Sequence, residues 1–391
     1  MSNIYTSIHS YIKNPLTLIL YVTTFIIAAY NLRIGTILSP ESYLHSSTAE
    51  ALVSLKFNYF RFFEAFSLEQ LPNILPISLI AFLKIIFPNT WMEYFVYINI
   101  ACVFFSIYLF QRVMLHLKID TVVISICCFL FLFSSDFLTW PRYILYDTIY
   151  VGFAFLLIHL TLSIKNFDLK KIFIWLLCLL FVALTNKLAI PVITMSILFL
   201  FIYKMKLNGK VILIISLLSL LTSALLYSIL TSVLINHSNL SEWSLQTINF
   251  EKLGIVIHSR PDTYINMSDD IFGFFKLFCY RFLYFFNPYA SSFSIIHIIF
   301  NSVITMVYFL GLIISTWNWT LVTFEQKQYF LKINLFILSI AIFHSATLID
   351  ADWRYRFPVI ILMIIIGAIS FQSLIYVSKE GNIKISKNKV I

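Results

Sequence analysis

Long apolar runs separated by short polar segments set the pattern of this chain. Runs of about 17–25 apolar residues recur along it, which is the length that an α-helix needs to cross the hydrocarbon core of a bilayer. The chain has 391 residues with only eight Gly and ten Pro, so long uninterrupted helices are expected. Backbone polar groups in lipid must be satisfied within a helix or a closed barrel. The pattern therefore predicts an all-α polytopic membrane protein with a single integral membrane domain over residues 1–391.

The apolar runs divide this domain into six parts. The predicted order is a first transmembrane helix at 16–38, an external loop with interfacial helices at 39–71, a transmembrane core at 72–235, an external loop region at 236–294, C-terminal transmembrane helices at 295–376 and a basic cytoplasmic tail at 377–391. Two shorter runs, 72–87 and 271–286, carry lysine or arginine and are interpreted as re-entrant or interfacial helices. This interpretation gives about ten crossings, whereas about twelve would turn three basic loops outward, against the positive-inside tendency.

Charge sets the predicted orientation. Four lysines follow position 376, which indicates a cytoplasmic C-terminus. Three basic loops then also face the cytoplasm: 112–118, 165–171 and 204–210. All but four of the 18 acids fall on the outer face, the exceptions being Asp120, Asp168, Glu325 and Glu380. Acids contribute little to orientation, so this asymmetry is not forced by topology and indicates that the chemistry lies on the outer face.

Composition narrows the class of protein further. Apolar residues make up 60% of the chain and 40 residues are Phe, a content that no soluble domain needs. The net charge of +9 does not indicate nucleic acid as a partner, because the basic residues lie mostly in short loops that set orientation. The five cysteines lie in apolar surroundings without metal-ligand spacing and are interpreted as packing residues. Membrane lipids are thus expected around the chain.

A charged stretch between two long apolar runs, at 349–358, is the strongest candidate for chemistry. Four of its ten residues are charged: Asp350, Asp352, Arg354 and Arg356. Two arginines present planar forks of donors that suit a phosphate. Pro358 suits the first turn of the following helix, because it lacks a backbone donor. The alternative is a surface loop whose arginines anchor the helix in lipid headgroups.

The first external loop supplies a candidate general base. Glu41 lies three residues beyond the first predicted crossing and is followed by Tyr43 and His45. Apolar residues at 48–66 recur every three or four positions, which fits an amphipathic helix in the membrane interface. A carboxylate beside such a helix could deprotonate a hydroxyl acceptor while a lipid-borne donor approaches from the membrane. The alternative is an ordinary loop glutamate.

Four further residues are candidates for binding substrate. Asp136 lies in an external loop, and Asp147 lies at the outer end of the next crossing, where it could coordinate a divalent cation or orient an acceptor. Asp147 equally suits a helix N-terminus, where the dipole stabilises an acid. Lys187 could contact a phosphate or extend to the headgroups. His344 precedes Asp350 by six residues and is expected to face the same cavity.

In order and spacing, these parts resemble the GT-C superfamily of membrane glycosyltransferases. The resemblance is to the bacterial branch related to protein O-mannosyltransferases and to the transferases that modify lipid A with aminoarabinose. It is carried by Glu41 and Tyr43, the interfacial segment 48–66, the Pro-led run 71–87, Asp136 or Asp147, His344, and Asp352-Trp353-Arg354-Tyr355-Arg356-Phe357-Pro358. The first-loop acid is Glu rather than the commoner Asp, and the short aspartate pairs of many members are not evident.

The resemblance implies a GT-C-like bundle that moves a sugar from a polyprenyl-phosphate donor to a hydroxyl of a lipid, glycan or protein. It implies Glu41 as the base, Arg354 and Arg356 at the donor phosphate, and Asp147 and Asp352 orienting substrates. The site would face the periplasm or exterior from a bacterial inner membrane. No cofactor is certain, and a divalent cation remains an option.

Two other functions stay open. An O-antigen or capsule polymerase is also polytopic, with a large external loop and essential arginines, for which Arg260 and Arg281 are weak candidates. A flippase or transporter for lipid-linked sugars would be expected to show repeated halves and mid-membrane charge. No internal repeat is evident, and the charges cluster at the outer face instead.

Overall fold

A computed structural model describes residues 15–66, 68–163, 169–186, 189–201, 214, 218, 271–289, 294–346 and 356–388. Within these residues the chain forms helices and no strands, and one isolated bridge joins Ile37 to Tyr143. The prediction of an all-α polytopic membrane protein is therefore confirmed.

The described helices follow the apolar runs along the chain. They are α2 (Pro15–Ile34), α3 (Pro40–Ser54), α4 (Tyr59–Phe66), η1 (Leu68–Asn73), α5 (Ile74–Ile86), α6 (Trp91–His116), α7 (Thr121–Leu132), α8 (Ser135–Thr139), η2 (Trp140–Arg142), α9 (Asp147–Ser163), α10 (Leu169–Ala183), α11 (Ile190–Phe201), α14 (Ile271–Phe285), α15 (Ile295–Trp317), α16 (Phe324–Ala346) and α17 (Phe357–Asn388). Among the described residues, five helices are long and apolar enough to cross a membrane: α2, α6, α15, α16 and α17. Because other stretches are not described, the number of crossings stays a prediction.

The helix predicted at 48–66 is wrong as a single element. Helix α3 already begins at Pro40, because Ser39 and Ser42 form a capping box there. It ends at Ser54, and Lys56 and Phe57 then adopt left-handed backbone angles, with φ of 53° and 58°. A right-handed helix cannot continue through such residues. Helix α4 starts afresh behind them, so the segment is two short helices.

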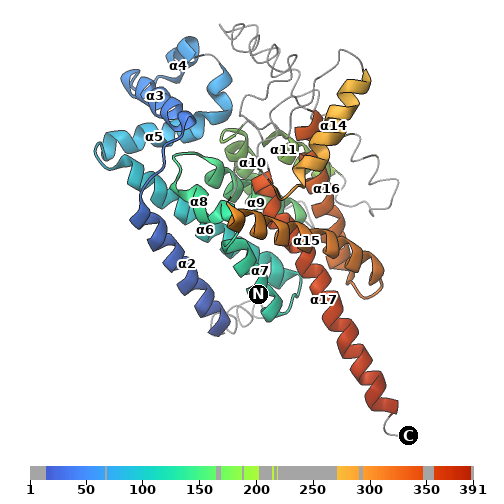
Figure 1. The fold of residues 1–391 in the computed structure, drawn as a ribbon. Coiled ribbons are helices and arrows are strands. Elements are labelled where there is room, and N and C mark those ends of the chain that lie inside the picture. The colour runs from blue at the N-terminus through green and yellow to red at the C-terminus, as the bar shows by residue number, and fades with distance from the viewer. Residues whose placement is uncertain are drawn as a thin grey trace.

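Two clusters of buried apolar residues hold the bundle together. The larger one joins α6, α7, α9, α11, α16 and α17, and the smaller one joins α3, α5 and α6. Figure 1 shows α3, α4 and α5 grouped at one end of the bundle, while the last turns of α17 project from the opposite end. The first half of α17 is buried on all sides. The start of α17 therefore lies inside the bundle rather than at its surface.

Helices α15 and α17 approach each other through small residues. The hydroxyls of Ser315 and Ser370 lie 2.6 Å apart, and the Ser370 hydroxyl is also 2.7 Å from the carbonyl oxygen of Gly311. A Cβ atom on Gly367 would lie 2.2 Å from Cγ1 of Val307. Between membrane helices, close packing and hydrogen bonds replace the hydrophobic driving force, so this crossing depends on glycine.

We expect Gly367→Ala to destabilise the purified protein by about 1–3 kcal/mol, because the added methyl overpacks this crossing. Thermal unfolding in detergent measures the effect. Gly152→Ala is the matched control, since a Cβ there would meet its nearest atom at an ordinary 3.4 Å. Val307→Ala should restore stability to Gly367→Ala by removing the clashing atom. Equal unfolding midpoints for the two glycine variants would contradict this account.

Candidate functional site

The segment between α2 and α3 is joined to the segment before α9 by backbone hydrogen bonds. The amide of Ile37 donates to the carbonyl of Arg142 at 2.9 Å, and the amide of Ile144 donates back to the carbonyl of Ile37 at 3.3 Å. The Nε of Arg142 donates to the carbonyl of Gly35 at 3.0 Å. Two regions 107 residues apart in sequence thus lie side by side.

A buried asparagine in α6 supports this junction. The Nδ2 of Asn99 lies 3.2 Å from the carbonyl oxygen of Pro141 and 3.0 Å from that of Tyr143. A third carbonyl, that of Leu145, is 3.5 Å away. Asn99 is fully buried, so its side-chain amide supplies these carbonyls with a hydrogen-bond donor at a position that water does not reach. One side chain therefore shapes the irregular backbone that leads into α9.

The junction brings the start of α3 towards the start of α9. Glu41 is the second residue of α3, and Asp147 is the first residue of α9. His45, one turn after Glu41, lies against Tyr146, with 4.4 Å between ring centroids and 3.3 Å between Nδ1 and the hydroxyl. Asp147 is buried, where the positive end of the helix dipole stabilises its carboxylate. The start of α3, which carries Glu41, thus lies next to the start of α9, which carries Asp147.

A second group of predicted residues meets at the start of α17. Arg356 is buried, and its Nη1 donates to the carbonyl of Asn287 at 3.2 Å. The ring of His344 stacks on Phe285, two residues before Asn287, with 6.2 Å between centroids. The end of α14 therefore connects His344 in α16 to Arg356. We call these four residues, Phe285, Asn287, His344 and Arg356, the Arg356 region. The expectation that His344 faces the same cavity as Asp350 stays a prediction, because Asp350 lies outside the described residues.

Helix α8 also contacts the start of α17. The ring of Phe137 lies 4.6 Å from that of Phe357, the residue after Arg356, and 3.9 Å from that of Phe131 in α7. Asp136 directly precedes Phe137, so it lies one residue from a side chain that contacts the start of α17. Asp147, in contrast, lies one residue from Tyr146, which contacts α3.

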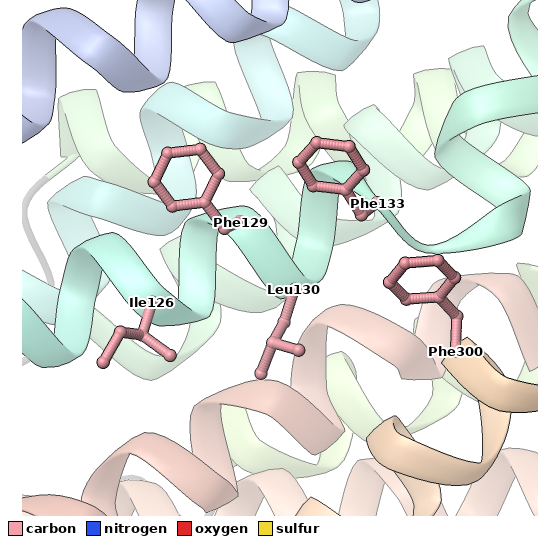
Figure 2. A pocket seen from close by; sticks show the side chains of 5 residues that line it. All are labelled: Ile126, Phe129, Leu130, Phe133 and Phe300. Atoms are coloured by element: carbon pink, nitrogen blue, oxygen red, sulfur yellow. The ribbon is translucent and has the colours of Figure 1, made fainter.

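An apolar groove opens between α7 and α15, and we call it the α7–α15 groove. Its lining is Ile126, Phe129, Leu130, Phe133 and Phe300. Figure 2 shows Ile126, Phe129 and Leu130 spread along α7, with Phe133 just after its last turn and Phe300 of α15 beside Phe133. The rings of Phe133 and Phe300 stack with 6.3 Å between centroids. Phe133 lies four residues before Phe137, so the groove ends near the Arg356 region.

Several predicted site residues, or their side chains, lie outside the part of the chain that the structure describes. Lys187, Asp350, Asp352, Arg354 and Tyr355 lie outside the described residues, and the side chains of Glu41 and Asp136 are not described. Tyr43 is described and is largely exposed on α3. No group of three or more potential metal ligands occurs among the described residues. A cation at Asp147 therefore remains a sequence-based expectation.

Three residues of these regions were missed by the sequence-based predictions. Asn99 donates to backbone carbonyls, and Asn287 accepts from Arg356 through its own backbone carbonyl; neither contact leaves a mark in a sequence. Tyr146 is one of three tyrosines close to Asp147, and nothing in the sequence distinguishes it from the other two. The spacing of four residues between Glu41 and His45 was a usable signal, because it places both positions on one helix face.

No family model matches the chain, and no curated protein or solved structure matches it either. The resemblance described above therefore depends on the residues alone.

We expect Asn99→Leu to destabilise the protein by about 1–3 kcal/mol, because buried carbonyls lose their donor. Thermal unfolding, together with limited proteolysis between residues 140 and 146, measures this effect. Asn31→Leu in α2 is the matched control: Asn31 is also buried, but the carbonyls of Pro141 and Tyr143 have their side-chain donor in Asn99 and not in Asn31. If Asn31→Leu lowered stability as much and exposed the same cleavage sites, the assigned role of Asn99 would be wrong.

Proposed function

We propose that this protein is a membrane glycosyltransferase of the GT-C type, using a polyprenyl-phosphate sugar as donor. The observation that carries the proposal is the placement of Arg356. It belongs to the stretch Asp-Trp-Arg-Tyr-Arg-Phe-Pro, and it lies buried at the first turn of a central helix, oriented by the carbonyl of Asn287. A guanidinium in a dry site interacts with an anion far more strongly than one among headgroups does. This favours phosphate binding over headgroup anchoring.

The reaction follows from where charge develops. The bond between the sugar C1 and the phosphate oxygen breaks, and the electron pair leaves with the polyprenyl phosphate. Arg356, with Arg354, would stabilise the negative charge that develops on that phosphate. The acceptor hydroxyl forms the new bond to C1 and gives its proton to the carboxylate of Glu41. Asp147 and Asp352 would orient the substrates.

The α7–α15 groove supports a donor with an isoprenoid tail. Its lining is almost wholly apolar and it opens at the surface of the bundle. It ends near Phe137, whose ring contacts Phe357 beside Arg356. A tail in the groove would therefore stay in lipid while the phosphate reaches the guanidinium. The acceptor would be a lipid, glycan or protein on the outer face of a bacterial inner membrane.

We expect wild-type protein to retain a polyprenyl-monophosphate sugar in native mass spectrometry, and Arg354→Ala/Arg356→Ala to lose it. Arg356→Lys should bind more weakly than wild type, because a lysine keeps the charge but not the planar fork. Arg33→Ala, which removes an exposed arginine at the end of α2, is the matched control and should bind normally. Equal binding by all variants, or binding of diphosphate-linked oligosaccharides only, would favour a polymerase or flippase instead.

We expect Leu130→Ser and Phe300→Ser to raise the KM for a long-chain donor by about tenfold each, since burying a leucine or phenylalanine side chain contributes roughly 1.5–3 kcal/mol. A donor with a tail too short to reach the groove should show the same KM with wild type and variants. Ile313→Ser, at an exposed position of α15 outside the groove lining, is the control. Equal increases for both donors would show that the groove does not hold the tail.

A further inference from the structure

The contact between His45 and Tyr146 joins the two helices that carry the predicted acids. His45 follows Glu41 by four residues on α3, so the two positions share one face of that helix. Tyr146 directly precedes Asp147, the first residue of α9. The ring contact therefore connects the turn after Glu41 to the residue before Asp147.

Packing alone does not account for this pair. His45 and Tyr146 are both buried, at 7% and 8% exposure, and each must bring a polar group out of water. Burying a polar group costs free energy unless a hydrogen bond compensates for it. A leucine and a phenylalanine would fill similar space without that cost. The polar pair restricts orientation as well, because the hydrogen bond between the Tyr146 hydroxyl and Nδ1 holds the ring of His45 in one position.

Helix α3 is fixed on its neighbouring face as well. The Nζ of Lys84 in α5 donates to the Ser46 hydroxyl at 2.7 Å and to the Ser46 carbonyl at 3.1 Å. The same ammonium forms an ion pair with Glu50, one turn further along. Contacts at the adjacent residues 45 and 46 thus hold α3 from two directions, which leaves it little freedom to rotate about its axis.

We propose that His45 is a positioning residue for sugar transfer: through Tyr146, it sets the distance and orientation of the Glu41 carboxylate relative to Asp147. This inference rests on the proposed function and goes beyond it, because it assigns His45 as the residue that keeps Glu41 in position. A general base acts only within hydrogen-bond reach of the proton it removes, so a small rotation of α3 slows transfer without changing how the donor binds.

The test compares His45→Leu, Tyr146→Phe and the double variant in a sugar-transfer assay with purified protein. We expect each single variant to lower kcat by roughly 10- to 100-fold with the donor KM almost unchanged. The double variant should be no slower than either single variant, because both remove the same bond. His45→Asn should recover most of the rate, since its side-chain oxygen can accept a hydrogen bond where Nδ1 does.

His297→Leu is the matched control. His297 also pairs its Nδ1 with a hydroxyl near a helix start, that of Ser294 at 2.7 Å, but at the beginning of α15. This variant should transfer sugar at the wild-type rate. The thermal unfolding midpoint of every variant, measured in the same detergent, checks that the fold is kept.

A measurement without substrate tests the contact itself. In protein labelled with nitrogen-15 histidine, the His45 signals are those that disappear in His45→Asn, and Tyr146→Phe should shift the Nδ1 signal among them. An unchanged Nδ1 signal would overturn the inference. So would additive losses in the double variant, or a full rate with Tyr146→Phe, while wild type still transfers sugar. If wild type transferred no sugar from any polyprenyl-monophosphate donor, the proposed function would fail, and the positioning role with it.

Discussion

The burial of the first half of α17 is the constraint on which the rest of this structure depends. From Phe357 to Ile369 this helix is enclosed by neighbours, and α15 crosses it closely enough that Gly367 leaves no room for a methyl group. In lipid, helices gain little from the hydrophobic effect when they associate, so close packing and a few hydroxyl bonds must hold such a crossing. Because Arg356 immediately precedes α17, the buried position of this helix also places Arg356 inside the bundle.

Two of the buried polar side chains bond to backbone that departs from helix. Asn99 serves the carbonyls of the turn before α9, and Arg356 serves the carbonyl of Asn287 after α14. Irregular backbone at membrane depth is tolerated only where protein or a polar cavity satisfies it. The same requirement accounts for Arg356 between the end of α14 and the start of α17, and for Asn99 beside the backbone that leads into α9. These are the places where a polar substrate group could be accommodated.

Much of the fold follows from the sequence because lipid allows few alternatives. Apolar runs become helices, and Pro358 correctly marks the first turn of α17. The break between α3 and α4 was not predicted, because the left-handed backbone at Lys56 and Phe57 occurs in residues that rarely adopt it.

The candidate site is less predictable than the fold. Charge drew attention to Arg356 as a candidate, while the expectation for His344 came from its spacing to Asp350. The sequence could not reveal that Asn287 contacts the guanidinium or that Ile37 pairs with Arg142, because main-chain groups are the same in every residue. Contacts between distant segments depend on how the helices pack, and periodicity along one segment does not report that.

The position of α17 in the chain has a consequence for biosynthesis. A ribosome delivers the chain from its N-terminus, so the helices that surround α17 enter the membrane before it does. The faces of α15 and α16 that later cover α17 must meanwhile meet lipid or the insertion machinery. The backbone amide of Asp120 donates a hydrogen bond to Oε1 of Gln372, 252 residues later, so this bond also forms only after α17 has been made. The other described helices can thus insert during translation, while the contacts of Arg356 form only after α17 has packed between its neighbours.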